Sequence, residues 1–131
     1  MKICQLPIYK KAINIEEITE ALVSSFDKNN YGKEREICNK MILKSKDITQ
    51  KIFAAEGGDK YSIRIRYALQ IKCAAKELQA MLMMCSMLNL AHEDYISFLI
   101  EEVNTFRQLF LDWVASFDKA NDVYDEWYFE V

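Results

Sequence analysis

A long apolar seam in the second half of the chain constrains the fold more than any other feature. Apolar residues recur there at alternating steps of three and four: Ala68, Ile71, Ala75, Leu78, Leu82 and Cys85. This spacing places the six side chains along one stripe of an α-helix, as in helices that pack lengthwise against other helices. The seam therefore predicts a long helix over residues 59–89 that faces a helical core.

Three further segments have apolar residues at helical spacing, and they predict helices over 7–25, 33–55 and 92–118. The chain of 131 residues contains only three glycines and one proline. So few turn-forming residues argue against β-sandwiches and barrels. Four amphipathic helices with short connections predict an all-α, antiparallel up-down-up-down four-helix bundle. We assign residues 1–119 to this bundle and residues 120–131 to an acidic, aromatic C-terminal tail.

The apolar stretches are too short to cross a membrane. The richest of them, residues 81–90, is about half of the roughly 18 residues that a membrane-spanning helix requires. The first seven residues are too few and too mixed in character for a signal peptide. None of the four cysteines forms a CxxC pair, and reduced thiols on helix faces pack as small apolar groups. We therefore expect a cytoplasmic protein without membrane contact.

Catalytic signatures are missing from the sequence. A carboxylate-bridged di-metal site in a four-helix bundle needs two Glu-x-x-His pairs, but the only histidine is His92, and Asn89 stands three residues before it. Glu17 and Glu20 have suitable spacing but no matching ligands, which favours a solvated helix face. We therefore expect no catalytic residue, no metal site and no cofactor. A metal-dependent enzyme is the less favoured alternative, which metal analysis of the purified protein tests.

Charge is distributed unevenly along the chain. Residues 1–76 contain 15 Lys and Arg against 9 Asp and Glu, whereas residues 77–131 contain 2 against 11. The formal net charge of −3 thus conceals a basic half and an acidic half. Such asymmetry predicts charged partners, or head-to-tail association of unlike surfaces between copies of the chain.

A stripe of lysines borders the apolar face of the second predicted helix: Lys33, Lys40, Lys44 and Lys51. Four cations of the next helix extend this basic half: Arg64, Arg66, Lys72 and Lys76. One interpretation is a surface for the phosphate backbone of RNA or DNA, which lysines bind as point charges without regard to sequence. The other is that the lysine stems cover apolar surface while their ammonium groups stay in water. A single helix favours the second interpretation, and an oligomer that repeats the stripe favours the first.

The end of the third predicted helix is apolar on nearly every side. Residues 81–88 read MLMMCSML. A helix that is apolar all round must be buried all round, which a single four-helix bundle does not provide. We therefore predict a subunit interface or partner groove formed by Met81, Met83, Met84, Met87 and Leu88. A wide internal core is the alternative.

Two short motifs resemble a known family. Residues 6–10, LPIYK, resemble the LPxYK start of the accessory variability determinant (Avd) proteins, which accompany the reverse transcriptase of diversity-generating retroelements. Residues 26–32, FDKNNYG, resemble the connection after the first helix in the same proteins. This connection also resembles that of the wider four-helix-bundle family encoded in 23S rRNA intervening sequences. The Ala74-Ala75 pair fits the same plan, and the likeness covers about residues 6–118.

The resemblance implies a homopentameric ring of four-helix bundles. It also implies binding to a reverse transcriptase and to nucleic acid through basic surface, with no catalysis by the protein itself. The net acidic charge motivates an alternative, a protein–protein scaffold of the intervening-sequence type that does not bind nucleic acid. For the tail over 120–131, we expect docking on a neighbouring subunit or on the lysine stripe.

Overall fold

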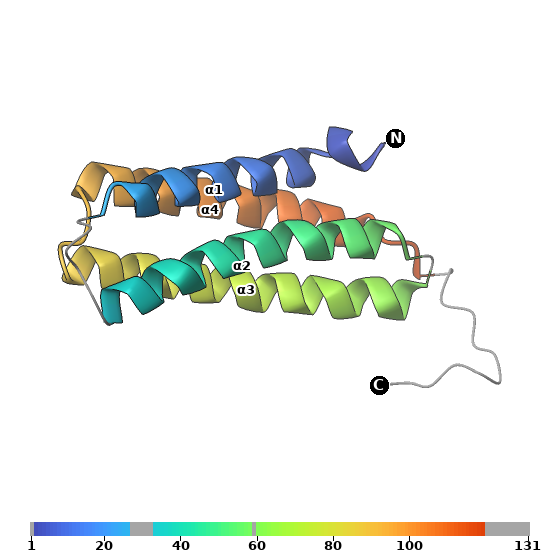
Figure 1. Cartoon of the computed structure of the whole chain (residues 1–131). Helices are drawn as coiled ribbons and strands as arrows, with labels where there is room; N and C mark the ends of the chain where they lie inside the picture. The colour runs from blue at the N-terminus through green and yellow to red at the C-terminus, as the bar shows by residue number, and fades with distance from the viewer. Residues whose placement is uncertain (1, 27–32, 59, 120–131) are drawn as a thin grey trace.

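The fold is taken from a computed structural model, which describes residues 2–26, 33–58 and 60–119. A short 3₁₀ helix, η1 (Ile3–Gln5), precedes four α-helices (Figure 1). These are α1 (Pro7–Ser24), α2 (Lys33–Glu56), α3 (Tyr61–Met87) and α4 (Glu93–Ala115). The described residues include no strand, so the prediction of an all-α four-helix bundle is confirmed. The predicted tail and the 27–32 connection lie outside the described residues.

Local hydrogen bonds explain where α3 ends and where α4 begins. Asn89 adopts a left-handed conformation with φ of 53°, and the Leu90 N–H donates to the Cys85 carbonyl at 3.0 Å. This geometry is a Schellman ending, in which Asn is one of the few residues that tolerates positive φ. His92 then caps α4, because its Nδ1 accepts the backbone N–H of Asp94 at 3.2 Å.

Each helix packs against two neighbours: α1 and α3 both lie between α2 and α4. The interhelical contacts pair rising with falling residue numbers. Between α2 and α3, Lys44 pairs with Glu77 and Glu56 with Arg64. Between α3 and α4, Ser86 bonds Glu93 and Gln79 bonds Asn104. These neighbouring helices therefore run in opposite directions.

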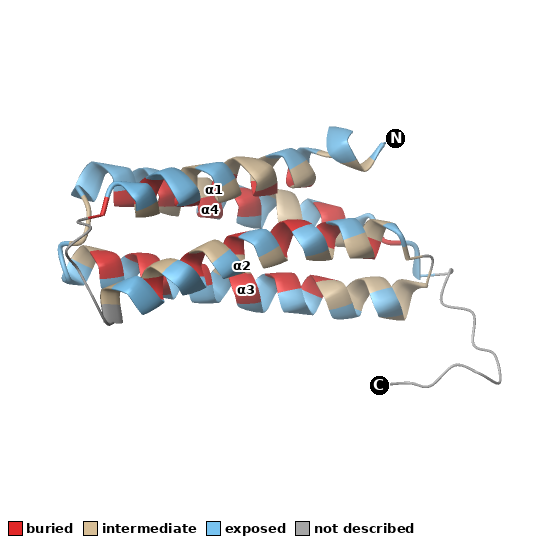
Figure 2. Ribbon diagram, viewed as in Figure 1, coloured by how far each residue is buried: buried red, intermediate tan, exposed pale blue. Residues whose placement is uncertain are grey.

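The core lies along the facing stripes of all four helices (Figure 2). Most residues of the predicted seam in α3 are buried. The buried apolar residues of α2 are Ile37, Met41, Ile48, Ile52 and Ala55. One position of the α3 seam differs, since Ala74 is buried whereas the predicted Ala75 is half-buried. The difference is confined to this turn, because the predicted positions on either side of it, Ile71 and Leu78, are both fully buried.

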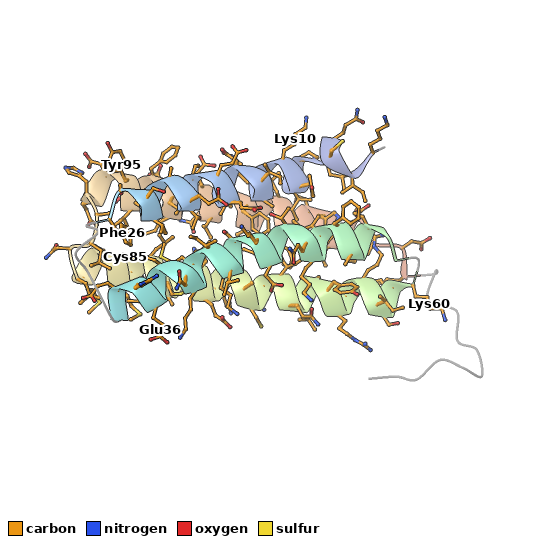
Figure 3. All side chains as sticks on the ribbon, viewed as in Figure 1. Lys10, Phe26, Glu36, Lys60, Cys85 and Tyr95 are labelled. Carbon is orange, nitrogen blue, oxygen red and sulfur yellow. The ribbon has the colours of Figure 1, made fainter. Side chains whose placement is uncertain are left out.

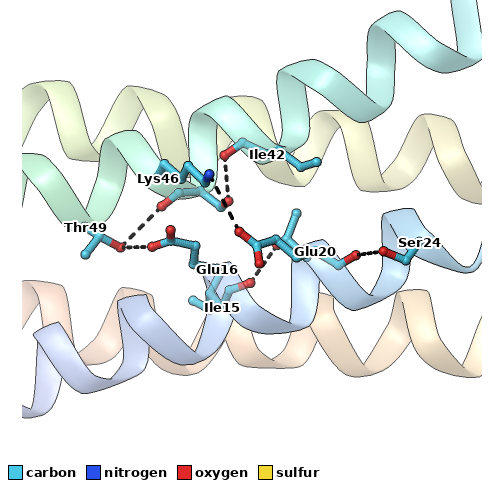
Figure 4. Close-up of polar contacts among 9 residues, drawn as sticks. Ile15, Glu16, Glu20, Ser24, Ile42, Lys46 and Thr49 are labelled. Atoms are coloured by element: carbon cyan, nitrogen blue, oxygen red, sulfur yellow. Dashed lines mark hydrogen bonds and ion pairs between the residues drawn. The ribbon is translucent and has the colours of Figure 1, made fainter.

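Polar contacts join α1 to α2 along the edge of this core (Figure 4). The buried Thr49 hydroxyl donates to Glu16 at 3.0 Å, and Lys46 lies 3.8 Å from Glu20 on the next turn of α1. Buried Thr19 satisfies its hydroxyl on the Ile15 carbonyl of its own helix at 2.7 Å. These hydroxyls are hydrogen-bonded, so they act as structural groups in the bundle.

None of the described helices combines the length and the apolar character that crossing a bilayer requires.

Candidate binding surfaces

The eight cations predicted to bind nucleic acid do not share one surface. Four of them line the face between α2 and α3: Lys40, Lys44, Lys51 and Arg66. Lys72 and Lys76 lie on the other side of α3, where it meets α4. Arg64 is part of a partly buried cluster at one end of the bundle. Lys33 begins α2, and its side chain lies outside the described part of the structure.

Two adjoining hollows mark the face between α2 and α3, with volumes of about 460 and 650 Å³. Together they are lined by five cations, which we call the α2–α3 basic face: Lys40, Lys44, Lys46, Lys51 and Arg66. Two carboxylates, Asp47 and Glu77, line the same hollows. The lining has five cations to two carboxylates, and two carboxylates just outside it, Glu36 and Glu20, pair with Lys40 and Lys46. Lys46 adds to the predicted set.

Most lysines of this face have nearby partners. Lys44 Nζ lies 2.7 Å from Glu77 Oε2, and this hydrogen bond raises the pKa of the Lys44 ammonium group. Lys40 pairs with Glu36 one turn away at 3.2 Å, and Lys51 lies 5.6 Å from the centre of the Tyr67 ring. The pairs involving Lys40 and Lys44 are largely exposed and contribute about 0–1 kcal/mol each. These carboxylates therefore hold their lysines only weakly.

Arg64 lies in a partly buried cluster, apart from the other predicted cations. Its Nη2 lies 2.7 Å from Glu56 Oε1, and the centre of its guanidinium lies 4.0 Å from the centre of the Phe117 ring. Trp113 Nε1 donates to the same Glu56 oxygen at 2.6 Å. The cluster joins α2, α3 and the end of α4, with the Arg64 and Glu56 side chains about one-fifth exposed. Arg64 therefore makes contacts that stabilise the bundle, and its role in nucleic-acid binding stays a prediction.

A groove of about 510 Å³ lies between α3 and α4. Its apolar lining comes mainly from α4: Val103, Phe106, Phe110 and Leu111. Its basic lining comes from Lys72 and Lys76 on α3 and from Arg107 on α4. The sequence analysis did not select Arg107, because its nearness to Lys76 depends on the antiparallel pairing of the two helices. We call this site the α3–α4 groove.

Exposed apolar side chains gather where α3 ends and α4 begins. Met87 is 80% exposed and Tyr95 is 63% exposed, and Tyr95 lies at the same end of the bundle as Cys85 (Figure 3). We define the apolar end patch by the four such residues on α3: Met83, Met84, Met87 and Leu88. Tyr95 and Phe98 are exposed on the side of α4 nearer α1, the side on which Glu102 of α4 pairs with Lys11. Tyr95 and Phe98 were not predicted, although they stand one helical turn apart on α4, outside its buried seam.

Met81 differs from the rest of the predicted interface. It is only 8% exposed and belongs to the core of the bundle. Its side chain therefore contributes to the internal packing that we weighed as the alternative for the Met-rich segment. Met83, Met84, Met87 and Leu88 remain exposed and available for contact with a partner.

Two cysteine thiols of the bundle are shielded from solvent, Cys85 fully and Cys38 in part. Burial raises the pKa of the Cys85 thiol to about 11, and its Sγ lies 3.5 Å from Met41 Sδ. Burial also raises the pKa of the Cys38 thiol. In the described residues, no group of three or more His, Cys, Asp or Glu side chains is placed to hold a metal ion.

In comparisons with known proteins, no protein-family model matches the chain and no curated protein matches it significantly. The likeness to Avd proteins therefore stands on the motifs at residues 6–10 and 26–32 and on the order of the helices.

Proposed function

We propose that this chain is a non-catalytic cytoplasmic accessory protein that binds nucleic acid as a homo-oligomer, in the manner of Avd proteins in diversity-generating retroelements. The observation that carries the proposal is the α2–α3 basic face, whose lining holds five cations and two carboxylates in a net acidic chain, with two further carboxylates paired to it from outside. The pentameric ring and the reverse-transcriptase partner come from the family resemblance.

The dimensions of the face suit a nucleic-acid backbone. Lys40 and Lys51 are eleven residues apart on α2, which corresponds to about 16 Å along the helix axis. That length equals about five base pairs of duplex at 3.4 Å each. The lysines would act there as sequence-independent point charges, and each subunit would bind weakly. A ring that repeats the face would bind more tightly, since linked sites raise the effective concentration of one another.

Binding to structured or single-stranded RNA, followed by fluorescence anisotropy, tests the proposal. We expect weak affinity that falls steeply between about 50 and 200 mM salt, because phosphate binding releases counterions. The charge-reversal variant Lys40→Glu/Lys44→Glu/Lys51→Glu should abolish binding.

The matched control is Lys2→Glu/Lys10→Glu/Lys119→Glu, which changes the net charge equally at exposed positions outside the face. This control should retain most of the affinity. If RNA does not bind at low salt, with or without a reverse transcriptase, the nucleic-acid role is wrong.

A second candidate function is a protein–protein scaffold of the intervening-sequence type. The carboxylates beside Lys40 and Lys44, together with the net charge of −3, favour it. This scaffold would use the apolar end patch for assembly and would show no salt-dependent RNA binding. A neighbouring reverse-transcriptase gene with paired template and variable repeats would favour the first function.

A further inference from the structure

The α3–α4 groove combines an apolar base with basic side chains around it. Its base is apolar, with Val103 and Phe106 buried and Phe110 half-buried. Leu111 is 50% exposed in the same lining, so it adds open apolar surface beside the buried base. Lys72, Lys76 and Arg107 supply three positive charges around this apolar base. A fitting occupant therefore combines aromatic or aliphatic side chains with carboxylates.

The chain itself contains such a segment. Residues 120–131 read ANDVYDEWYFEV, with four aromatic residues, four carboxylates and no Lys or Arg. The aromatic residues and carboxylates alternate closely: Asp122, Tyr124, Asp125, Glu126, Trp127, Tyr128, Phe129 and Glu130. The segment thus offers four negative charges to the three positive charges of the groove, and aromatic rings to its apolar base.

The position of the segment brings it within reach of the groove. Gln79 bonds Asn104 at 3.0 Å, which fixes the antiparallel pairing and brings Lys76 close to the level of Arg107. From Ala115, at the end of α4, the distance back to Arg107 is about 12 Å along the helix axis. The twelve residues over 120–131 reach about 40 Å when extended. They are therefore long enough to turn back and run the length of the groove.

The chain is also anchored just before this segment. Phe117 is 5% exposed, and its ring packs against Trp113 at 4.7 Å between centroids and against the Arg64 guanidinium. These contacts hold the backbone at the end of the bundle where α3 begins and α4 ends. A tethered segment has an effective concentration on the order of mM, so even weak contacts would keep it docked.

We propose that residues 120–131 fold back and dock in the α3–α4 groove of their own chain. Their aromatic side chains cover Phe110 and Leu111, and their carboxylates face Lys72, Lys76 and Arg107. Docking neutralises these cations, so Lys72 and Lys76 are withdrawn from any nucleic-acid surface and the α2–α3 basic face remains free. The inference does not depend on nucleic-acid binding.

Zero-length carbodiimide cross-linking of the full chain, read out by mass spectrometry, tests the docking. We expect isopeptide bonds from Asp125, Glu126 or Glu130 to Lys72 and Lys76. Mixing unlabelled with ¹⁵N-labelled chains before the reaction separates links within a chain from links between chains. Tail links spread evenly over exposed lysines such as Lys10, or links with mixed isotopes, would overturn docking in the same chain.

Acrylamide quenching of tryptophan fluorescence gives a second readout. Trp113 is 7% exposed, so quenching of the full chain reports mainly on Trp127. We expect Lys72→Glu/Lys76→Glu to raise the quenching constant of the full chain, because Trp127 loses its protection. Adding Asp125→Lys/Glu126→Lys to this variant should restore protection, whereas the control Lys2→Glu/Lys10→Glu should leave it unchanged. Equal quenching in all four proteins would overturn the proposal.

Discussion

Trp113 Nε1 donates a hydrogen bond of 2.6 Å to Glu56 Oε1, which joins the end of α4 to the last residue of α2. The same oxygen lies 2.7 Å from Arg64 Nη2 in the first turn of α3. One carboxylate therefore holds three helices together at the end of the bundle where residue 119 leaves it. In this partly buried setting, removing the carboxylate leaves a cation and an indole N–H without their partner.

The first prediction concerns this carboxylate. Glu56→Ala should lower the free energy of unfolding by about 2 kcal/mol, because the Arg64 charge and the Trp113 N–H lose their acceptor in a partly buried site. Urea unfolding followed by circular dichroism measures this change. Glu101→Ala, at an exposed position of α4, is the control and should stay within about 0.5 kcal/mol of the wild type. Equal effects of the two substitutions would show that the Glu56 contacts add nothing to stability.

A second prediction follows from the Cys85 thiol. Its pKa rises from 9.0 to about 11 in the folded chain because burial disfavours the thiolate. The folded state therefore holds this proton more tightly than the unfolded state, and the stability it contributes is present below pH 9 and lost as the pH rises through about 11. Between these values, Cys85→Ala should lose less stability with rising pH than the wild type does.

The measurement is urea unfolding at several pH values between 9 and 11, comparing the two proteins at each pH. The cavity left by the substitution lowers stability equally at every pH, so only the slope carries the prediction. Cys73→Ala, at an exposed position on the same helix, should keep the slope of the wild type. Parallel pH profiles for the wild type and Cys85→Ala would mean that this thiol does not contribute.

The sequence predicted the four helices, but it could not predict on which side of a helix each charged residue lies relative to the neighbouring helices. The apolar seams located all four helices because burial needs side chains at steps of three and four. Arg64 and Arg66 look equivalent in the sequence, yet they are about 200° apart on the helix. Arg64 consequently joins the Glu56 cluster while Arg66 lines the α2–α3 basic face.

The surroundings of Met81 and Arg107 likewise depend on how the helices pack, which the sequence alone does not show. A Met-rich stretch reveals an apolar helix end, but which of its residues face inward depends on how the neighbouring helices pack. Met81 is buried and Met87 is exposed for this reason. Arg107 joins Lys72 and Lys76 only because α4 runs antiparallel to α3, a relationship between residues that are more than thirty positions apart.

A third prediction concerns the ion pair between Lys44 and Glu77. If the α2–α3 basic face binds a phosphate backbone, Glu77 competes with phosphate for Lys44 at 2.7 Å. Glu77→Gln should therefore raise RNA affinity and steepen the salt dependence by about one unit of the log–log slope. Anisotropy titrations at several salt concentrations measure both quantities.

The control for this prediction is Glu101→Gln, which changes the net charge equally on α4. It should raise affinity less and leave the salt slope unchanged. If both substitutions act alike, the effect is one of overall charge, and the Lys44–Glu77 pair is not part of a phosphate-binding surface.

The last prediction concerns assembly through the apolar end patch. Met84 and Met87 are 45% and 80% exposed, so charges placed there would cost little in a monomer but would be buried unpaired in a subunit interface. Light scattering should give a molar mass of about 77 kDa for the wild type, five times the 15.4 kDa of one chain. Met84→Glu/Met87→Glu should reduce it to 15.4 kDa with unchanged helical content. Leu43→Glu/Phe53→Glu places the same charges at exposed apolar positions of α2 and should leave the mass unchanged. A wild type of 15.4 kDa would exclude the ring, and dissociation of both variants would place the interface beyond this patch.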